Sequence, residues 1–191
     1  MPNTSATGGY LVPTTGPVDD QALRRFLQAM IVGVTGLTGP MVRPLWQKNP
    51  PPIPNIEVDW IAFGIVEQRP DANPFHKQNA NSATLIRHEE FDVRCSVYGP
   101  SCQNYTGRLR EALYLAQNRE NLYLAGMGLV GFSPTTHIPE LINDRWFERA
   151  DITMTLRREI KREYPILNFV AADGTIKANR ATETLSINWS V

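Results

Sequence analysis

The chain has little of what marks a disulfide-stabilised, exported or membrane-spanning protein. Its 191 residues include only two cysteines, Cys95 and Cys102, whereas small secreted scaffolds carry many more. No apolar run approaches the roughly 20 residues needed to cross a bilayer, and the N-terminal sequence MPNTSATGGYLVPTTGP has no basic region followed by an apolar one. We therefore expect a cytoplasmic protein with two reduced thiols and no membrane contact. A Cys95–Cys102 disulfide is the alternative, and it would require an oxidising compartment.

The chain also lacks an excess of charge and a cluster of metal ligands. Nineteen Lys and Arg residues balance nineteen Asp and Glu residues, so no basic excess indicates nucleic acid or an anionic membrane as the main partner. Neither cysteine has a second ligand at the close spacing of zinc sites, and His76, His88 and His137 are scattered. We expect no metal site. A chain of this length buries about 70% of its unfolded surface, so one domain can be stable without metals or disulfides.

Motifs of catalysis are missing as well. The sequence contains no G-x-S-x-G serine and no G-x-x-x-x-G-K-[ST] phosphate loop. The glycines at 126–131 form G-x-G-x-x-G, but the sequence Phe-Ser-Pro follows them where a dinucleotide site needs a helix. The sequence HEE at 88–90 could supply a general base, yet neighbouring residues of an extended chain point to opposite faces. We predict a protein that is not an enzyme, with no catalytic residue and no cofactor.

The most specific segment that is present is RPLWQKNPPPIPNIEVDWIAFG at 43–64. Pro50, Pro51, Pro52 and Pro54 fix φ and remove backbone donors, so this segment is predicted to lie extended on a surface. Stiff extended segments lose little entropy when they are ordered against a partner. The segment therefore indicates a protein that works by docking.

Apolar periodicity predicts an α+β fold. The predicted helices are residues 17–36 and 101–120, and the predicted strands are 57–67, 82–98, 122–132, 146–161 and 184–191, with a bulge among the glycines of 122–132. Residues 68–81 are predicted as a long exposed loop, 139–144 as one helical turn, 166–170 as a short strand and 173–174 as a turn. The order α-β-β-α-β-β plus C-terminal β segments predicts a mixed, mainly antiparallel sheet with two main helices packed on one side.

This pattern also divides the chain. Residues 1–16 are predicted as a flexible N-terminal arm, 17–164 as the α+β domain and 165–191 as a C-terminal β extension. In the extension Leu185, Ile187 and Trp189 alternate with polar residues, so we expect its apolar edge to need a neighbour.

Charged residues of the strand at 146–161 leave alternatives open. Arg149 and Asp151 share one face, so they pair either weakly with each other or each with a neighbouring subunit. The sequence RREIKRE at 157–163 is either a solvated strand end or a basic surface that meets phosphate or an acidic subunit through Arg157, Arg158, Lys161 and Arg162.

Four segments, in order, carry a resemblance to a known family. They are RPLWQ followed by the proline run and DWIAFGI, then HEEFDVRCSVYGP, then LYLAQNRENL, and then RWFERADITMTLRR. With these segments, over about residues 40–165, the chain resembles the neck or tail terminator proteins of long-tailed bacteriophages and prophages.

The resemblance implies a structural virion protein of the tail and neck, assembled in the host cytoplasm. A terminator of this family forms a ring, typically six-membered, on the last ring of the tail tube, stops its growth and joins the tail to the neck or connector. The implied partners are further copies of the chain, the tail tube protein, the neck or connector protein and the tail sheath protein, while DNA passes through the lumen without being read.

The resemblance and the sequence pattern together give the candidate residues for contact with other subunits or partners. These candidates are Trp46, Pro51, Pro52, Phe75, Arg149, Asp151, Arg157, Arg158 and Trp189. Two other functions stay open at this point. One is another head–tail joining protein or a tail tube subunit, and the other is a small soluble enzyme that uses the HEE sequence at 88–90.

Overall fold

Two long antiparallel strands form the centre of the molecule. The structure, a computed structural model, describes residues 3, 7–17, 20–167, 173–180 and 183–190. Strand β4 (Ala83–Tyr98) pairs with β9 (Arg149–Tyr164) along its whole length, with Ala83 opposite Tyr164 and Tyr98 opposite Arg149. Strands of 16 residues extend about 50 Å. The prediction of a strand at 82–98 is confirmed.

Shorter strands extend this pair on both sides. On one side, β2 (Trp60–Pro70) and β3 (Phe75–Gln78) pair with β4, and β1 (Val42–Pro44) lies parallel to β2. On the other side, β5 (Met127–Phe132) and β6 (Thr136–His137) pair with β9. The register of β5 shifts between Leu129 and Gly131, so the predicted bulge is confirmed.

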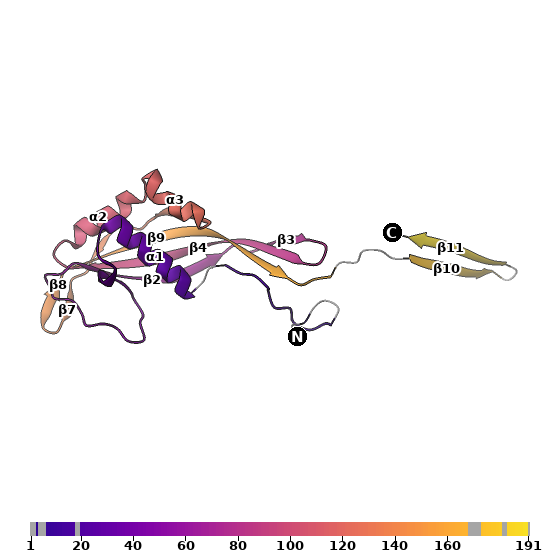
Figure 1. Cartoon of the computed structure of the whole chain (residues 1–191), viewed down its shortest axis with the longest axis horizontal. Coiled ribbons are helices and arrows are strands. Elements are labelled where there is room, and N and C mark those ends of the chain that lie inside the picture. Colours follow the sequence, from indigo (N-terminus) through magenta and orange to yellow (C-terminus); the bar gives the residue numbers. More distant parts are fainter. Residues whose placement is uncertain (1–2, 4–6, 18–19, 168–172, 181–182, 191) are drawn as a thin grey trace.

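The helices cover one face of this sheet, as Figure 1 shows. They are α1 (Asp20–Thr35), α2 (Cys102–Ala112) and α3 (Ala116–Leu124), and a short 3-10 helix spans Gly39–Met41. The main core lies between helices and sheet because alternate residues of β4 and β9 are apolar, among them Phe91, Val93, Cys95, Ile152, Met154 and Leu156. The α+β fold with a mixed, mainly antiparallel sheet is confirmed.

A second apolar cluster lies on the opposite face, at one end of the sheet. It contains Trp60, Ala62, Tyr98 and Phe147, and the rings of Trp60 and Tyr98 stack with centroids 4.2 Å apart. Phe147 belongs to a small hairpin of β7 (Glu140–Ile142) and β8 (Arg145–Phe147). Packing against this cluster therefore fixes the hairpin to the sheet.

The two ends of the chain lie toward the other end of the sheet (Figure 1). The backbone N–H of Thr14 donates to the carbonyl of Glu163 at 2.8 Å, and the N–H of Glu163 donates to Thr15 Oγ1 at 3.2 Å. The arm therefore runs beside the last residues of β9. Strands β10 (Asp173–Arg180) and β11 (Glu183–Ser190) form a separate antiparallel hairpin.

Several predicted boundaries are wrong. The first helix occupies Asp20–Thr35 within the predicted 17–36, and the helix predicted at 101–120 is two helices. Leu113 and Leu122 are both fully buried, but nine residues of one continuous helix would turn them to opposite sides. The break after α2 lets both leucines reach the core.

The remaining errors concern strands without apolar periodicity. The predicted loop 68–81 contains the end of β2 and all of β3. Residues in both of these strand segments are exposed on both faces, so their sequence shows no alternation of apolar and polar residues. The predicted helical turn at 139–144 is β7 and a tight turn at Asn143 and Asp144, both with positive φ. Residues 173–174 begin β10 and form no turn, and the strand predicted at 166–170 falls partly outside the described residues and has no strand at 166–167.

Gly99 allows the tight junction between β4 and α2. Its φ is 109°, and a Cβ atom there would lie 2.5 Å from Asp59 Oδ1. We predict that Gly99→Ala lowers the free energy of unfolding by about 2 kcal/mol because of this strain and clash. Urea denaturation measures the change.

Gly107→Ala is the matched control, because Gly107 lies in α2 and an added Cβ meets nothing within 4 Å. It should raise stability by up to about 1 kcal/mol through helix propensity. Equal effects of the two substitutions would contradict the role of Gly99.

Candidate functional site

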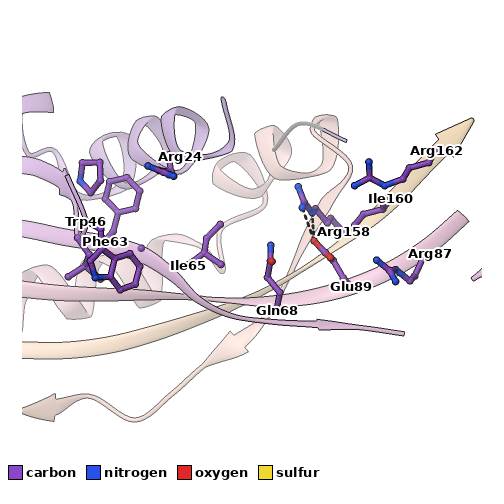
Figure 2. Close-up of a pocket in the computed structure, with 13 residues that line it drawn as sticks. Arg24, Trp46, Phe63, Ile65, Gln68, Arg87, Glu89, Arg158, Ile160 and Arg162 are labelled. Atoms are coloured by element: carbon purple, nitrogen blue, oxygen red, sulfur yellow. Dashed lines mark hydrogen bonds and ion pairs between the residues drawn. The ribbon is translucent and has the colours of Figure 1, made fainter. Parts of the chain in front are cut away.

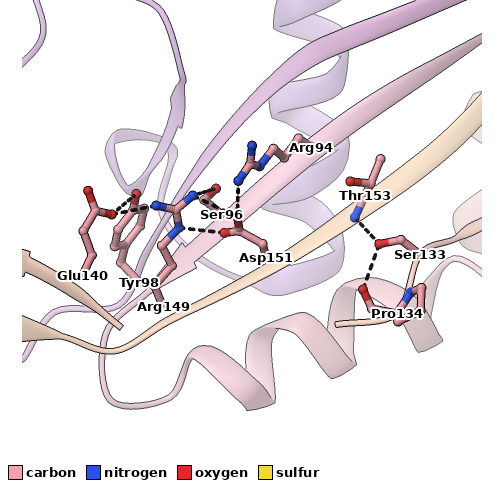
Figure 3. Close-up of polar contacts among 9 residues, drawn as sticks. All are labelled: Arg94, Ser96, Tyr98, Ser133, Pro134, Glu140, Arg149, Asp151 and Thr153. Carbon is pink, nitrogen blue, oxygen red and sulfur yellow. Dashed lines mark hydrogen bonds and ion pairs between the residues drawn. The ribbon is translucent and has the colours of Figure 1, made fainter. Parts of the chain in front are cut away.

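The face of the sheet opposite the helices carries a network of charged side chains (Figure 3). Alternation along the strands places Arg94 and Ser96 of β4 beside Arg149 and Asp151 of β9 on this face. The apolar residues between them face the core. The same period that builds the core therefore brings these charges together.

Arg149 is the centre of the network. Its Nε donates to Asp151 Oδ1 at 2.8 Å and its Nη2 donates to Asp151 Oδ2 at 2.9 Å, so the pair is bidentate. Arg149 Nη1 donates to Glu140 Oε2 at 2.7 Å, and the Tyr98 hydroxyl donates to the same oxygen at 3.1 Å. Arg94 also donates to Asp151. The network therefore connects strand β7 to the central sheet.

Burial and hydrogen bonding change the pKa values in this region. Burial alone would raise the pKa of Asp151, but hydrogen bonds from Arg149, Arg94 and Ser96 outweigh it and hold the pKa below its ordinary value. Burial raises the pKa of Tyr98 to about 12 and that of the Cys95 thiol to about 12. Burial also raises the pKa of Cys102. Both cysteines are free thiols, as predicted, and are protonated at neutral pH.

A second group of charges lines a groove on the side of the molecule where β1 ends (Figure 2). The groove has a volume of about 580 Å³, and Leu45, Trp46, Phe63 and Ile65 form its apolar part. Figure 2 shows Trp46 and Phe63 at one end and Arg87 and Arg162 at the other. A smaller hollow beside it shares Arg24, Pro44 and Trp46, and we call the two together the Trp46 groove.

The Trp46 groove is strongly basic. Its lining contains Glu89 and six cationic residues, which are Arg24, Arg25, Lys48, Arg87, Arg158 and Arg162. Arg158 is buried and its Nε donates to Glu89 Oε1 at 2.7 Å. Removing these seven residues from the 19 basic and 19 acidic residues of the chain leaves 13 basic and 18 acidic ones elsewhere. The neutral chain is therefore divided into a basic groove and an acidic remainder.

The residues predicted to contact other subunits differ widely in exposure. Trp46 is 65% exposed and Phe75 is 63% exposed, and Pro51, Pro52 and Arg157 are exposed too. Arg149 and Asp151 pair with each other, the first of the two alternatives, while Asp151 and Arg158 are buried inside the subunit. The side chain of Trp189 in β11 lies outside the described residues. Contact of these residues with another subunit stays a prediction.

Sequence reasoning missed several residues of these surfaces. The hairpin β7–β8 exposes Leu141 and Trp146, which are opposite each other in the register and are 55% and 65% exposed. The turn residues Asn143 and Asp144 between two short apolar pairs were the available signal. The basic groove could not be found from sequence, because its cations come from four separate segments.

The residues of the HEE sequence at 88–90 lie on different faces of β4. His88 has Asp71 and Glu159 at 3.9 Å, but it lies on the exposed outer part of β4, and Glu89 beside it points to the other face and pairs with Arg158. Within the described ranges no group of three or more His, Cys, Asp or Glu residues could hold a metal ion. No described helix is long and apolar enough to span a bilayer.

This α+β chain has a part-buried ionic network and several exposed aromatic residues, and exposed aromatic residues are common where proteins bind one another. Comparison with family models places it more closely: the model of the phage neck terminator proteins matches residues 21–180. The chain belongs to this family of structural phage proteins, as its sequence segments indicated. No curated protein matches the chain.

The lowered pKa of Asp151 predicts how the stability of the fold depends on pH. Since the pKa of Asp151 is lowered in the folded chain, its contribution to stability is present above the unfolded pKa of about 3.9 and is lost as pH falls through the folded value. We predict that Asp151→Asn lowers the free energy of unfolding at pH 7 by about 3 kcal/mol, because two guanidinium groups lose their carboxylate. The difference between variant and parent should shrink at pH 3.

Urea denaturation at pH 7, 5 and 3 tests this expectation. Asp71→Asn is the control, because Asp71 is half exposed and its ion pairs lie near the surface, so its effect should stay below about 1 kcal/mol. A difference between Asp151→Asn and the parent that is the same at pH 7 and pH 3 would show that the carboxylate charge has no role.

Proposed function

We propose that this chain is a tail terminator that forms a ring on the head-proximal end of the tail tube. The ring stops tube polymerisation and joins the tail to the neck or connector, and six subunits are the expected number. The protein acts without catalysis, through the shapes of its surfaces. Its contacts are with further copies of itself, the tail tube protein and the neck or connector protein, with the sheath protein as a further partner.

Membership of the phage neck terminator family is the observation that carries this proposal. The surface of the subunit supports it. Large apolar side chains are more than half exposed in separate regions, namely Trp46 near the groove, Phe75 on β3, Leu124 on α3 and Trp146 on β8. Exposed apolar groups in separate regions fit a ring subunit, which needs two side contacts and two axial contacts.

The elements that project from the sheet support the same proposal. Strand β3 and the outer half of the β4–β9 pair extend beyond the helices, and the β10–β11 hairpin lies apart from the sheet (Figure 1). A two-stranded hairpin alone is only marginally stable in water. In a ring with axial partners these elements would be covered, within interfaces of about 2,000 Å² or more.

Electron microscopy of the purified chain mixed with tail tubes tests the proposal. We expect closed single rings, at the end of the tubes and only at one end, and tubes that no longer lengthen when tube protein is added. The mass of the chain in solution, measured with and without tail tubes, gives the number of subunits. Long tubes made of this chain would instead identify it as a tail tube subunit, and rings found only on head connectors would identify another joining protein.

The enzyme alternative is tested with a double substitution, His88→Ala with Glu90→Gln. Both residues are partly exposed and lie outside the core, so we expect normal folding, ring assembly and tail joining, with any change in the free energy of unfolding below about 1 kcal/mol. Thermal unfolding, electron microscopy and an in vitro tail-joining assay measure these properties. Loss of tail joining with intact rings would favour a chemical role for this pair.

A further inference from the structure

The outward face of the β7–β8 hairpin has no partner within the described chain. The register places Leu141 opposite Trp146, and Ile142 opposite Arg145. Since side chains alternate along a strand, Leu141 and Trp146 share one face, while Phe147 and Ile142 belong to the other and pack on the second apolar cluster. One face of the hairpin is therefore anchored and the other is apolar and exposed.

Two carboxylates flank this apolar face. Asp144 lies in the turn and Glu148 directly after β8, two residues before and after Trp146 in the chain, and both are exposed. Neither forms an ion pair with a side chain that the structure describes, in contrast to Glu140, which binds Arg149. We call Leu141, Asp144, Trp146 and Glu148 the hairpin face.

The Trp46 groove has the complementary composition. Its apolar part, with Trp46, Phe63 and Ile65, can accept apolar side chains. Among its cations, Arg24, Arg25, Lys48 and Arg87 form no ion pair with any side chain in the described part of the chain. An apolar floor with a cationic rim fits a protein segment that carries apolar and acidic side chains together, and the hairpin face is such a segment.

The hairpin face cannot enter the groove of its own subunit. The hairpin is at one end of the sheet, whereas the groove lies under the first half of α1, toward the outer part of the β4–β9 pair (Figures 1 and 2). The short turn and the packing of Phe147 hold the hairpin in place. Only a second copy can bring the two surfaces together.

We propose that the hairpin face of one subunit binds in the Trp46 groove of the next subunit. The contact is heterologous, since a different surface is used on each side, and a contact of this kind generates a ring when its rotation closes. This inference rests on the proposed ring and names the residues that close it.

Cysteine cross-linking tests the contact. Asn49→Cys lies in the lining of the groove and Arg145→Cys is an exposed position next to Trp146 in β8, so neither substitution removes a residue of the hairpin face or a cation of the groove. The native cysteines are buried thiols of raised pKa and should not react. We expect a short bismaleimide to link subunits when the two variants are mixed, and each variant alone to remain unlinked.

The control replaces Arg145→Cys with Arg110→Cys, an exposed residue of α2 away from both surfaces. Cross-linking of Arg145→Cys alone would show a two-fold contact between hairpins and overturn the proposal. Equal linking in the control mixture would do the same.

The second measurement is the strength of self-association. Trp146→Ser, and separately Asp144→Asn with Glu148→Gln, should each raise the dissociation constant for self-association by at least about tenfold in sedimentation experiments, and high salt should reduce the effect of the second variant. Tyr123→Ser removes an equally exposed aromatic residue from α3 and should leave association unchanged. Unchanged association in the hairpin variants would overturn the proposal.

The tests are run on the purified chain and on the chain bound to tail tubes, which separates this inference from the proposed function. If rings cap tubes but the Asn49→Cys and Arg145→Cys variants are not cross-linked, the hairpin contact is wrong and the terminator function still stands. A chain that neither associates nor caps tubes would overturn both.

Discussion

The antiparallel pairing of β4 with β9 is the interaction on which the rest of the structure depends. Because the two strands pair from end to end, their alternate residues define one face for the apolar core and one for charged side chains. Strands β2, β3, β5 and β6 each pair with one of these two strands, β1 pairs with β2, and the helices cover only the part of the pair away from β3. A one-residue slip would exchange the faces and bury Arg94 and Arg149 in the core.

The ionic network fixes the position of the β7–β8 hairpin relative to the sheet. Arg149 and Tyr98 both bind Glu140, the first residue of β7, while Asp151 holds the guanidinium of Arg149 from the opposite side. A buried ion pair adds little net stability compared with apolar packing, but it admits only one geometry. The network therefore serves to place β7, and with it the hairpin face, at a fixed angle to the sheet.

The sequence predicted those helices and strands whose buried residues recur at a regular spacing. Strand β4 was predicted nearly to the residue, since its apolar and polar residues alternate, and the α+β class followed from the order of such segments. Strand β3 was missed because both of its faces are exposed, and the hairpin β7–β8 was missed because strands of three residues are too short to show a period. The Trp46 groove could not be predicted from the sequence either. Its cations lie on α1, on the segment after β1, and on β4 and β9, and only folding joins them.

The separation of charge within a neutral chain favours one direction of assembly. Two hairpin faces brought together would place the carboxylates of Asp144 and Glu148 of one subunit against those of the other, and two grooves would oppose their arginines. Like charges at an interface cost several kcal/mol, so both symmetric pairings are disfavoured. Only the pairing of a hairpin face with a groove joins opposite charges, and it leaves a free groove at one end and a free hairpin face at the other. Such a chain of subunits ends only by closing on itself, so the rotation fixed by the network at Arg149 would decide how many subunits the ring contains.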